Sequence, residues 1–119
     1  MSRIVTGQAV YEKGQKVAAV PIVRRAAQDQ HCKLHIPGIC RQHPQYTVGC
    51  HMRLFGLAGM AEKPDDIFII DACDLCHAVF DSRDKWADAA LGWDDVLRAF
   101  MKTLYTRRAS GLILLKGEK

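Results

Sequence analysis

The spacing of apolar residues in the last third of the chain predicts one long helix. From residue 94 onward apolar side chains recur every three or four positions, which is the period of one helix face. The members of this stripe are Val96, Leu97, Phe100, Met101, Leu104 and Tyr105. We expect Asp94 or Asp95 to cap this helix, Gly111 to end it and the stripe to lie in the core. Residues 112–115 are all apolar and predict a short final strand.

Two earlier stretches have the patterns of strands. Residues 46–52 are β-prone and alternate, whereas residues 67–70 form the continuous apolar run of a buried strand. A connector that contains Gly56, Gly59 and Pro64 separates them. These patterns predict a β-hairpin with a long, flexible loop, followed by a thiol turn and a helix with His77 just inside it.

The beginning of the chain has weaker patterns. Residues 17–23 could form a short strand interrupted by Pro21, and residues 24–30 could form two helical turns. We expect residues 1–21 to be a partly flexible extension and residues 22–119 to form a single domain. The fold class predicted for that domain is α+β.

Composition limits the class of protein. The chain has 119 residues, of which 49% are apolar and 25% charged, as in an ordinary soluble domain with a modest core. It has no apolar run long enough to cross a bilayer and no continuous signal-peptide core, so we expect a cytoplasmic protein without a membrane partner. A net charge of +4 permits nucleic-acid binding without being specific for it.

The cysteines predict a structural zinc site. In the reducing cytoplasm, clustered thiols bind metal more often than they form disulfides. A Cys-x-x-Cys turn and a Pro-Gly turn can bring four of the five together, namely Cys32, Cys40, Cys73 and Cys76. Zinc bound there would supply folding energy to a small domain. A redox-active pair would need a thioredoxin-like βαβ context, which is absent, and His77 could replace one thiol as ligand.

Two histidines and a carboxylate could form a second site. His51 ends the first predicted strand, and His77 and Asp81 share one helix face because they are four residues apart. If the hairpin folds against this helix, the three side chains converge. They could hold a divalent cation that neutralises a phosphate, with one histidine as general base, since the pKa of histidine is near neutral pH. The alternative for a histidine at a strand end is a hydrogen-bonded structural role.

The order of these residues resembles the zinc-bearing HNH nucleases of the ββα-metal (treble-clef) group. More closely, it is similar to the YbcO-like nuclease family of prophages. The resemblance spans roughly residues 22–116. It is carried by IPGIC (36–40), HMRL (51–54), KP (63–64), Asp66, AC (72–73), CH (76–77) and Asp81.

This resemblance implies a metal-dependent DNA endonuclease that acts in phage recombination or DNA processing. By position, His51 matches the first His of the HNH pattern, the expected general base. His77 matches the last His, the expected ligand of a catalytic Mg²⁺ or Mn²⁺. Many HNH enzymes have Asp before the first His, where this chain has Cys50, and their middle Asn is also missing. The candidate substitutes as metal ligands are Asp66, Asp71 and Asp81.

Cations are expected to contact DNA phosphates, with strong salt dependence and little base specificity. Arg53, beside His51, is the first candidate for a bidentate contact with the scissile phosphate. Further cations could flank the groove or simply be solvated surface: Arg24, Arg25, Lys33, Arg41, Arg83 and Lys85.

The sequence leaves three functions open. The first is hydrolysis of DNA. The second is a zinc-stabilised nucleic-acid-binding module without catalysis, which would show salt-dependent affinity and no turnover. The third is a phage accessory protein that binds another protein, for instance a recombination protein, and shows neither property.

Overall fold

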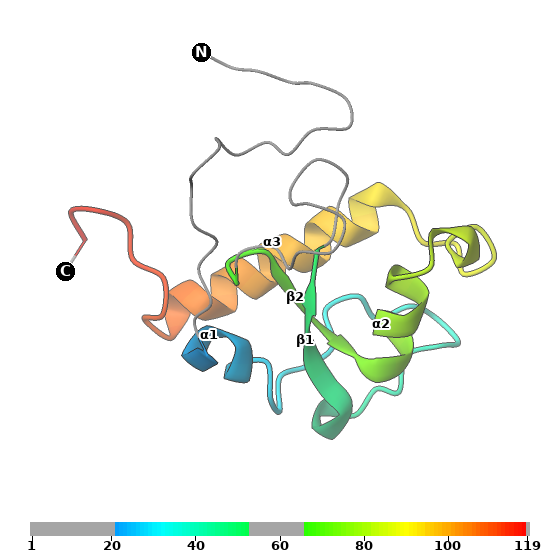
Figure 1. The fold of residues 1–119 in the computed structure, drawn as a ribbon, viewed down its shortest axis with the longest axis horizontal. Coiled ribbons are helices and arrows are strands. Elements are labelled where there is room, and N and C mark those ends of the chain that lie inside the picture. The colour runs from blue at the N-terminus through cyan, green and yellow to red at the C-terminus, as the bar shows by residue number, and fades with distance from the viewer. Residues whose placement is uncertain (1–20, 53–65, 119) are drawn as a thin grey trace, which may run out of the picture.

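The computed structural model of the protein describes residues 21–52 and 66–118. In these ranges the chain forms a two-stranded antiparallel sheet, three α-helices and two short 3-10 helices (Figure 1). In chain order the elements are α1 (Pro21–Arg25), η1 (Pro44–Tyr46), β1 (Thr47–His51), β2 (Ile69–Cys73), α2 (Asp74–Phe80), η2 (Arg83–Lys85) and α3 (Trp93–Ala109). The predicted α+β class, hairpin and long C-terminal helix are confirmed. No helix within the described ranges is long and apolar enough to span a bilayer.

The register of the hairpin separates two neighbouring residues of β1. Cys50 pairs with Ile70, and His51 pairs with Ile69. Residues opposite each other in a sheet share a face, whereas consecutive residues point to opposite faces. The side chains of Cys50 and His51 therefore leave the strand on opposite sides.

Different segments cover the two faces of the hairpin. Cys50 belongs to the apolar core together with Phe80 of α2. On the other face, a Cβ atom added to Gly49 would meet the backbone oxygen of Arg24 at 3.5 Å and the Cβ of Ala27 at 3.7 Å. Glycine at this position thus lets α1 and the turn after it pack directly on the sheet.

The outer edge of β2 is occupied by other segments of the chain. The backbone N–H of Lys33 donates to the Asp71 carbonyl at 2.7 Å, and the Asp71 N–H donates to the Thr103 hydroxyl at 3.1 Å. These bonds satisfy edge groups that would otherwise be available to another strand.

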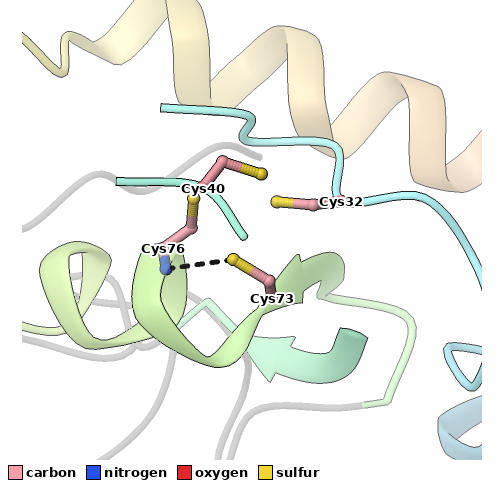
Figure 2. A group of neighbouring side chains, drawn as sticks. All are labelled: Cys32, Cys40, Cys73 and Cys76. Carbon is pink, nitrogen blue, oxygen red and sulfur yellow. Dashed lines mark hydrogen bonds between the residues drawn. The ribbon is translucent and has the colours of Figure 1, made fainter. Parts of the chain in front are cut away.

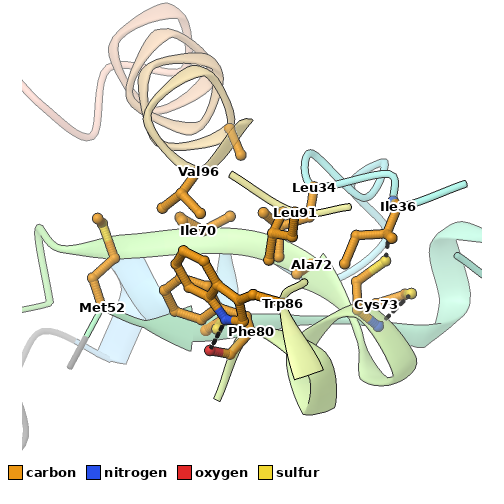
Figure 3. Packing of buried hydrophobic residues seen from close by; sticks show 13 residues of the cluster. Leu34, Ile36, Met52, Ile70, Ala72, Cys73, Phe80, Trp86, Leu91 and Val96 are labelled. Atoms are coloured by element: carbon orange, nitrogen blue, oxygen red, sulfur yellow. Dashed lines mark hydrogen bonds between the residues drawn. The ribbon is translucent and has the colours of Figure 1, made fainter. Parts of the chain in front are cut away.

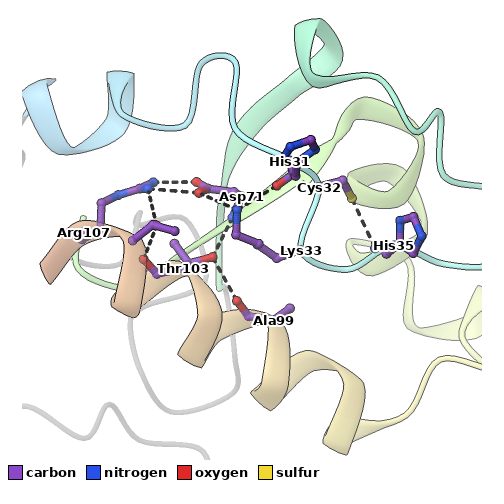
Figure 4. Close-up of polar contacts among 9 residues, drawn as sticks. His31, Cys32, Lys33, His35, Asp71, Ala99, Thr103 and Arg107 are labelled. Atoms are coloured by element: carbon purple, nitrogen blue, oxygen red, sulfur yellow. Dashed lines mark hydrogen bonds and ion pairs between the residues drawn. The ribbon is translucent and has the colours of Figure 1, made fainter. Parts of the chain in front are cut away.

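A buried ion pair connects β2 to α3. The Arg107 guanidinium binds the Asp71 carboxylate in a bidentate manner, at 3.0 and 2.5 Å, and both side chains are almost fully buried (Figure 4). The Lys33 ammonium lies 3.9 Å from the same carboxylate, and its burial lowers the pKa of Lys33. Asp71 is therefore engaged in holding the fold.

The apolar core lies between the hairpin, α2 and α3. Ile70 of β2, Leu91 and Val96 pack together, with Phe80 and Trp86 beside them (Figure 3). The Phe80 and Trp86 rings stack at a centroid distance of 5.7 Å, and the indole N–H of Trp86 donates to the Phe80 carbonyl at 3.0 Å. This satisfied polar atom allows a large indole to be buried without the cost of an unpaired donor.

The face that α3 turns to the core differs from the predicted stripe. Its fully buried positions are Val96, Ala99, Thr103 and Arg107. Three predicted core residues are mostly exposed, Leu97, Met101 and Tyr105. The expectation was wrong because the ion pair of Arg107 and the Thr103 contact fix the rotation of the helix, and small Ala99 permits close approach. The start of α3 agrees better with the expectation that Asp94 or Asp95 caps it, since the Asp95 carboxylate accepts a hydrogen bond from the Gly92 N–H at 2.9 Å.

The predicted strand at residues 112–115 is not formed. These residues turn back after α3, and Leu114 and Leu115 are exposed. The outer edge of β2 is already covered by Lys33 and Thr103, so it offers no free edge there.

The N-terminal predictions are tested only in part. Residues 21–23, the end of the short strand considered for residues 17–23, are helical in α1, and the helix predicted for residues 24–30 is reduced to turns after Arg25. Residues 1–20 and the connector 53–65 lie outside the described residues. The extension at residues 1–21 and the single domain at 22–119 remain predictions.

Candidate metal centres

The four thiols predicted to bind zinc lie together in the structure. Cys73 caps the N-terminus of α2, Cys76 lies in its first turn, and Cys32 and Cys40 approach from the loop on the other side (Figure 2). Their sulfur atoms all lie within 4.8 Å of one another. The Pro-Gly turn between Cys32 and Cys40 therefore brings these two residues together as the sequence indicated.

The backbone around the sulfurs suits bound thiolates. Each sulfur accepts a hydrogen bond from a backbone N–H. The donors are His35 to Cys32 at 3.3 Å, Ile36 to Cys76 at 3.4 Å, Gln42 to Cys40 at 3.4 Å and Cys76 to Cys73 at 3.4 Å. Two of these donors, His35 and Gln42, have the positive φ of a tight turn. Tetrahedral zinc at 2.3 Å from each thiolate separates the sulfurs by about 3.8 Å, which this arrangement accommodates. The residues therefore fit a zinc ion.

The ionisation of the thiols is uneven without a cation. The Cys76 thiol donates to Cys32, which lowers the pKa of Cys32 to about 4 and raises the pKa of Cys76. Burial raises the pKa of Cys40 to about 11. One thiolate is thus favoured, and a dication is what would stabilise four of them together.

A second group of potential ligands combines β1 with α2. The Cys50 sulfur, a ring nitrogen of His77 and a carboxylate oxygen of Asp81 lie within 4.8 Å of one another. Nε2 of His77 is 2.9 Å from Asp81 Oδ2, as expected for positions four apart on a helix that extends to its C-cap. Cys50 completes the group because its side chain leaves β1 on the face that packs against α2.

His51 has a different environment. Its Nε2 atom lies 2.8 Å from Asp66 Oδ1, and Arg24 Nε lies 3.3 Å from the other oxygen of this carboxylate. Both His51 and Asp66 are largely shielded from solvent. The two imidazoles therefore belong to different groups, and Asp66 accompanies His51 instead of His77 and Asp81.

Some of the predicted DNA-binding cations are engaged within the protein. Arg41 forms a bidentate pair with Asp74 at 2.6 and 3.0 Å, and its guanidinium lies 4.3 Å from the Tyr46 ring centroid. This pairing lowers the pKa of Asp74 and raises the pKa of Arg41. Lys33 points inward to Asp71 and to the carbonyl of His31, so it is not positioned as a surface phosphate contact.

The other predicted cations are exposed or undescribed. Arg25, Arg83 and Lys85 lie at the surface. Arg53 lies outside the described residues, so its expected contact with the scissile phosphate stays a prediction.

The structure brings Cys50 close to His77 and Asp81 and pairs Asp66 with His51, and the sequence reasoning anticipated neither arrangement. The signal for Cys50 was its position directly before His51, where HNH enzymes have a metal-binding Asp. The pairing of His51 with Asp66 could not be inferred, because the two residues are fifteen apart across a connector without a defined pattern.

Comparison with known proteins identifies the family. The profile of the family described as "Putative nuclease YbcO" matches residues 22–111. The chain belongs to the YbcO family. It is 34% identical over 91 residues to "Putative nuclease YbcO" of Escherichia coli (strain K12) and to the equally named protein of Enterobacteria phage 82, covering 76% of this chain and 95% of each relative.

The chain is also similar in fold to a solved structure. The chain has a TM-score of 0.60 and 29% identity to a protein described as a "putative bacteriophage protein" from Escherichia coli K-12 MG1655. The match covers 76% of this chain and all of the other. Both candidate metal centres lie within the segment that matches the YbcO family.

Proposed function

We propose that the protein is a metal-dependent endonuclease of the HNH type that hydrolyses phosphodiester bonds of DNA. The observation that carries this proposal is the group of Cys50, His77 and Asp81, because Cys50 is the neighbour along β1 of His51, which pairs with Asp66. The order β1, β2, α2 and the names of the YbcO relatives support it. The HNH assignment takes the ββα unit as the catalytic core and the four-thiol cluster as a structural zinc site.

In this proposal His51 is the general base. Asp66 accepts a hydrogen bond from Nε2, so that Nε2 carries the proton and Nδ1 keeps its lone pair. Nδ1 removes a proton from the water that attacks the phosphorus, which typically contributes 10²–10⁴-fold to a rate. Asp66 fixes the orientation of the ring and stabilises the imidazolium that results. Arg24 in turn holds Asp66 in place.

The second group holds the catalytic ion. His77 and Asp81 present a nitrogen and an oxygen, and Cys50 adds a sulfur. A bound divalent ion supplies charge neutralisation for the scissile phosphate and the leaving oxygen. Because thiolate ligands favour zinc and similar transition metals over Mg²⁺, inclusion of Cys50 shifts the expected ion from Mg²⁺ or Mn²⁺ toward Zn²⁺, Co²⁺ or Ni²⁺.

The proposed setting follows from the substrate. We place the activity in the cytoplasm, on phage or prophage DNA during recombination or processing, and a recombination protein is a candidate partner.

The direct test is cleavage of supercoiled plasmid across a panel of divalent metals. His51→Ala and His77→Ala should each reduce nicking by about 100-fold or more, because they remove the base and a metal ligand respectively. His31→Ala is the matched control, since this imidazole is exposed and outside both groups. Equal nicking by all four proteins would contradict the assignment. Salt-dependent binding without any nicking would favour the non-catalytic module.

A further inference from the structure

The Arg83 side chain lies between two indole rings just after α2. Its guanidinium carbon is 4.4 Å from the Trp86 ring centroid and 4.8 Å from that of Trp93. The two indoles meet edge to face at 4.9 Å. Both cation–π distances are within the range of favourable interaction, so the rings hold the guanidinium in one position.

This cluster is attached to the turn that carries a proposed metal ligand. Asp81 follows Phe80 directly, and Arg83 comes two residues later. Trp86 is fixed on Phe80 by its ring stack and by its N–H bond to the Phe80 carbonyl. The guanidinium and the indoles are therefore held at a set place in the segment that follows Asp81.

The outward-facing groups of the cluster remain available. The Arg83 guanidinium has no hydrogen bond or ion pair with any described residue. Most other arginines in the same ranges are paired with carboxylates, namely Arg24, Arg41, Arg98, Arg107 and Arg108. Trp93 is 49% exposed, whereas Trp86 is 5% exposed. The cluster thus presents unused N–H donors and one accessible aromatic ring.

We propose that Arg83 and Trp93 form a nucleotide-binding surface in which Arg83 binds a backbone phosphate and Trp93 stacks on an unpaired base. Guanidinium donors match phosphate oxygens, and an exposed indole is a stacking platform for any base. The inference rests on the proposed function and narrows its substrate to DNA with unpaired nucleotides beside the cleaved bond.

A protein partner is a less suitable occupant of this surface. Trp93 does begin an exposed apolar row on α3 that continues with Leu97, Met101 and Tyr105. However, an apolar partner laid over Trp93 would also cover the Arg83 guanidinium without supplying an anion, which is unfavourable. A nucleotide supplies both the anion and the flat ring.

The test compares two single-stranded oligonucleotides with the same backbone. One is a fluorescein-labelled ten-nucleotide oligothymidylate, and the other is its fully abasic counterpart. Binding is measured by anisotropy with zinc-loaded protein that carries His51→Ala in the parent and in every variant, so that hydrolysis does not interfere. The parent protein should bind the base-containing strand about ten-fold more tightly, as expected for stacking on one aromatic ring.

The variants separate stacking from charge. Trp93→Ala should lose the preference for the base-containing strand while keeping its affinity for the abasic strand. Trp93→Phe should retain most of the preference for the base-containing strand. Arg83→Ala should weaken binding of both strands and reduce the slope of log affinity against log salt by about 0.7. Tyr105→Ala, exposed on the same helix, is the matched control and should bind like the parent.

Several results would overturn the inference. Equal affinity of the parent for both strands, or an unchanged preference in Trp93→Ala, would exclude the stacking surface. A changed sedimentation coefficient in Trp93→Ala without a changed preference would assign the ring to protein docking. Plasmid cleavage without base preference would leave the nuclease standing and remove this surface. A base preference that depends on Trp93, without cleavage in any metal, would support this surface and contradict the nuclease.

Discussion

Two adjacent residues of β1 contribute to two different groups, because a strand alternates its side chains between faces. Cys50 faces α2 and lies beside His77 and Asp81, whereas His51 faces the opposite side and lies beside Asp66. Since they are consecutive residues, their Cα atoms are only about 3.8 Å apart. In the proposed mechanism, neighbouring positions of β1 thus supply a ligand of the ion and the general base.

Asp71 was a candidate metal ligand, but its carboxylate is buried and bound by Arg107, so it holds the fold. Arg107→Met should leave its buried carboxylate without its main partner and lower the free energy of unfolding by about 3 kcal/mol, as for other broken buried pairs. Urea denaturation would measure this. In the control, Arg108→Met, the lost pair with Glu118 is exposed, so the change should be about 0–1 kcal/mol. Equal effects of the two substitutions would contradict this account of Asp71.

At the scale of elements, the sequence predicted the hairpin and the helix after it, because the apolar run before β2 and the thiol turn are local signals. It also predicted the existence of α3. It did not predict which face of α3 is buried, since that depends on the pair of Arg107 with Asp71 across the fold. The false strand at residues 112–115 has a similar cause, because strand formation needs a free edge and apolarity alone does not reveal one.

The proposed sites were accessible to sequence reasoning to different degrees. The thiols of α2 and their partners have recognisable spacing, and His77 and Asp81 share a helix face by periodicity. The contribution of Cys50 depends on the register of β1 against β2, and that of Asp66 on the path of the connector. Neither is encoded in a local pattern.

We expect helix α2 to depend on the proposed zinc site at its N-terminus, because Cys73 is its N-cap. Removing zinc with a chelator should unfold most of the domain, since structural zinc contributes free energy comparable to the whole stability of a small domain. Circular dichroism should show loss of helix, and added zinc should restore it. Cys76→Ser should lose the tightly held zinc, whereas Cys50→Ser, outside this cluster, should retain it. A metal-free protein with unchanged helix content and melting temperature would contradict a structural role.

At the scale of the whole molecule, one ββα unit is shared by both candidate centres. The thiol cluster holds the beginning of α2, and the proposed catalytic group uses its later turn together with β1. α3 and the loop at Lys33 cover the outer edge of β2, which keeps the hairpin in place between them. Under the proposed function, this arrangement lets a small domain with a limited core position the groups that hydrolysis would need.

The central claim is that Cys50, His77 and Asp81 hold the ion used in hydrolysis, and a change of metal preference tests it most directly. Rates of plasmid nicking would be measured for the parent and for Cys50→Asp in Zn²⁺, Ni²⁺, Mn²⁺ and Mg²⁺. Replacing a soft thiolate by a hard carboxylate should raise the rate in Mg²⁺ relative to Ni²⁺ by about ten-fold or more. Such a change in the ratio of two rates cannot result from misfolding, which lowers all rates together. An unchanged ratio of the rate in Mg²⁺ to the rate in Ni²⁺ would contradict the assignment of Cys50 as a ligand and, with it, the proposed catalytic centre.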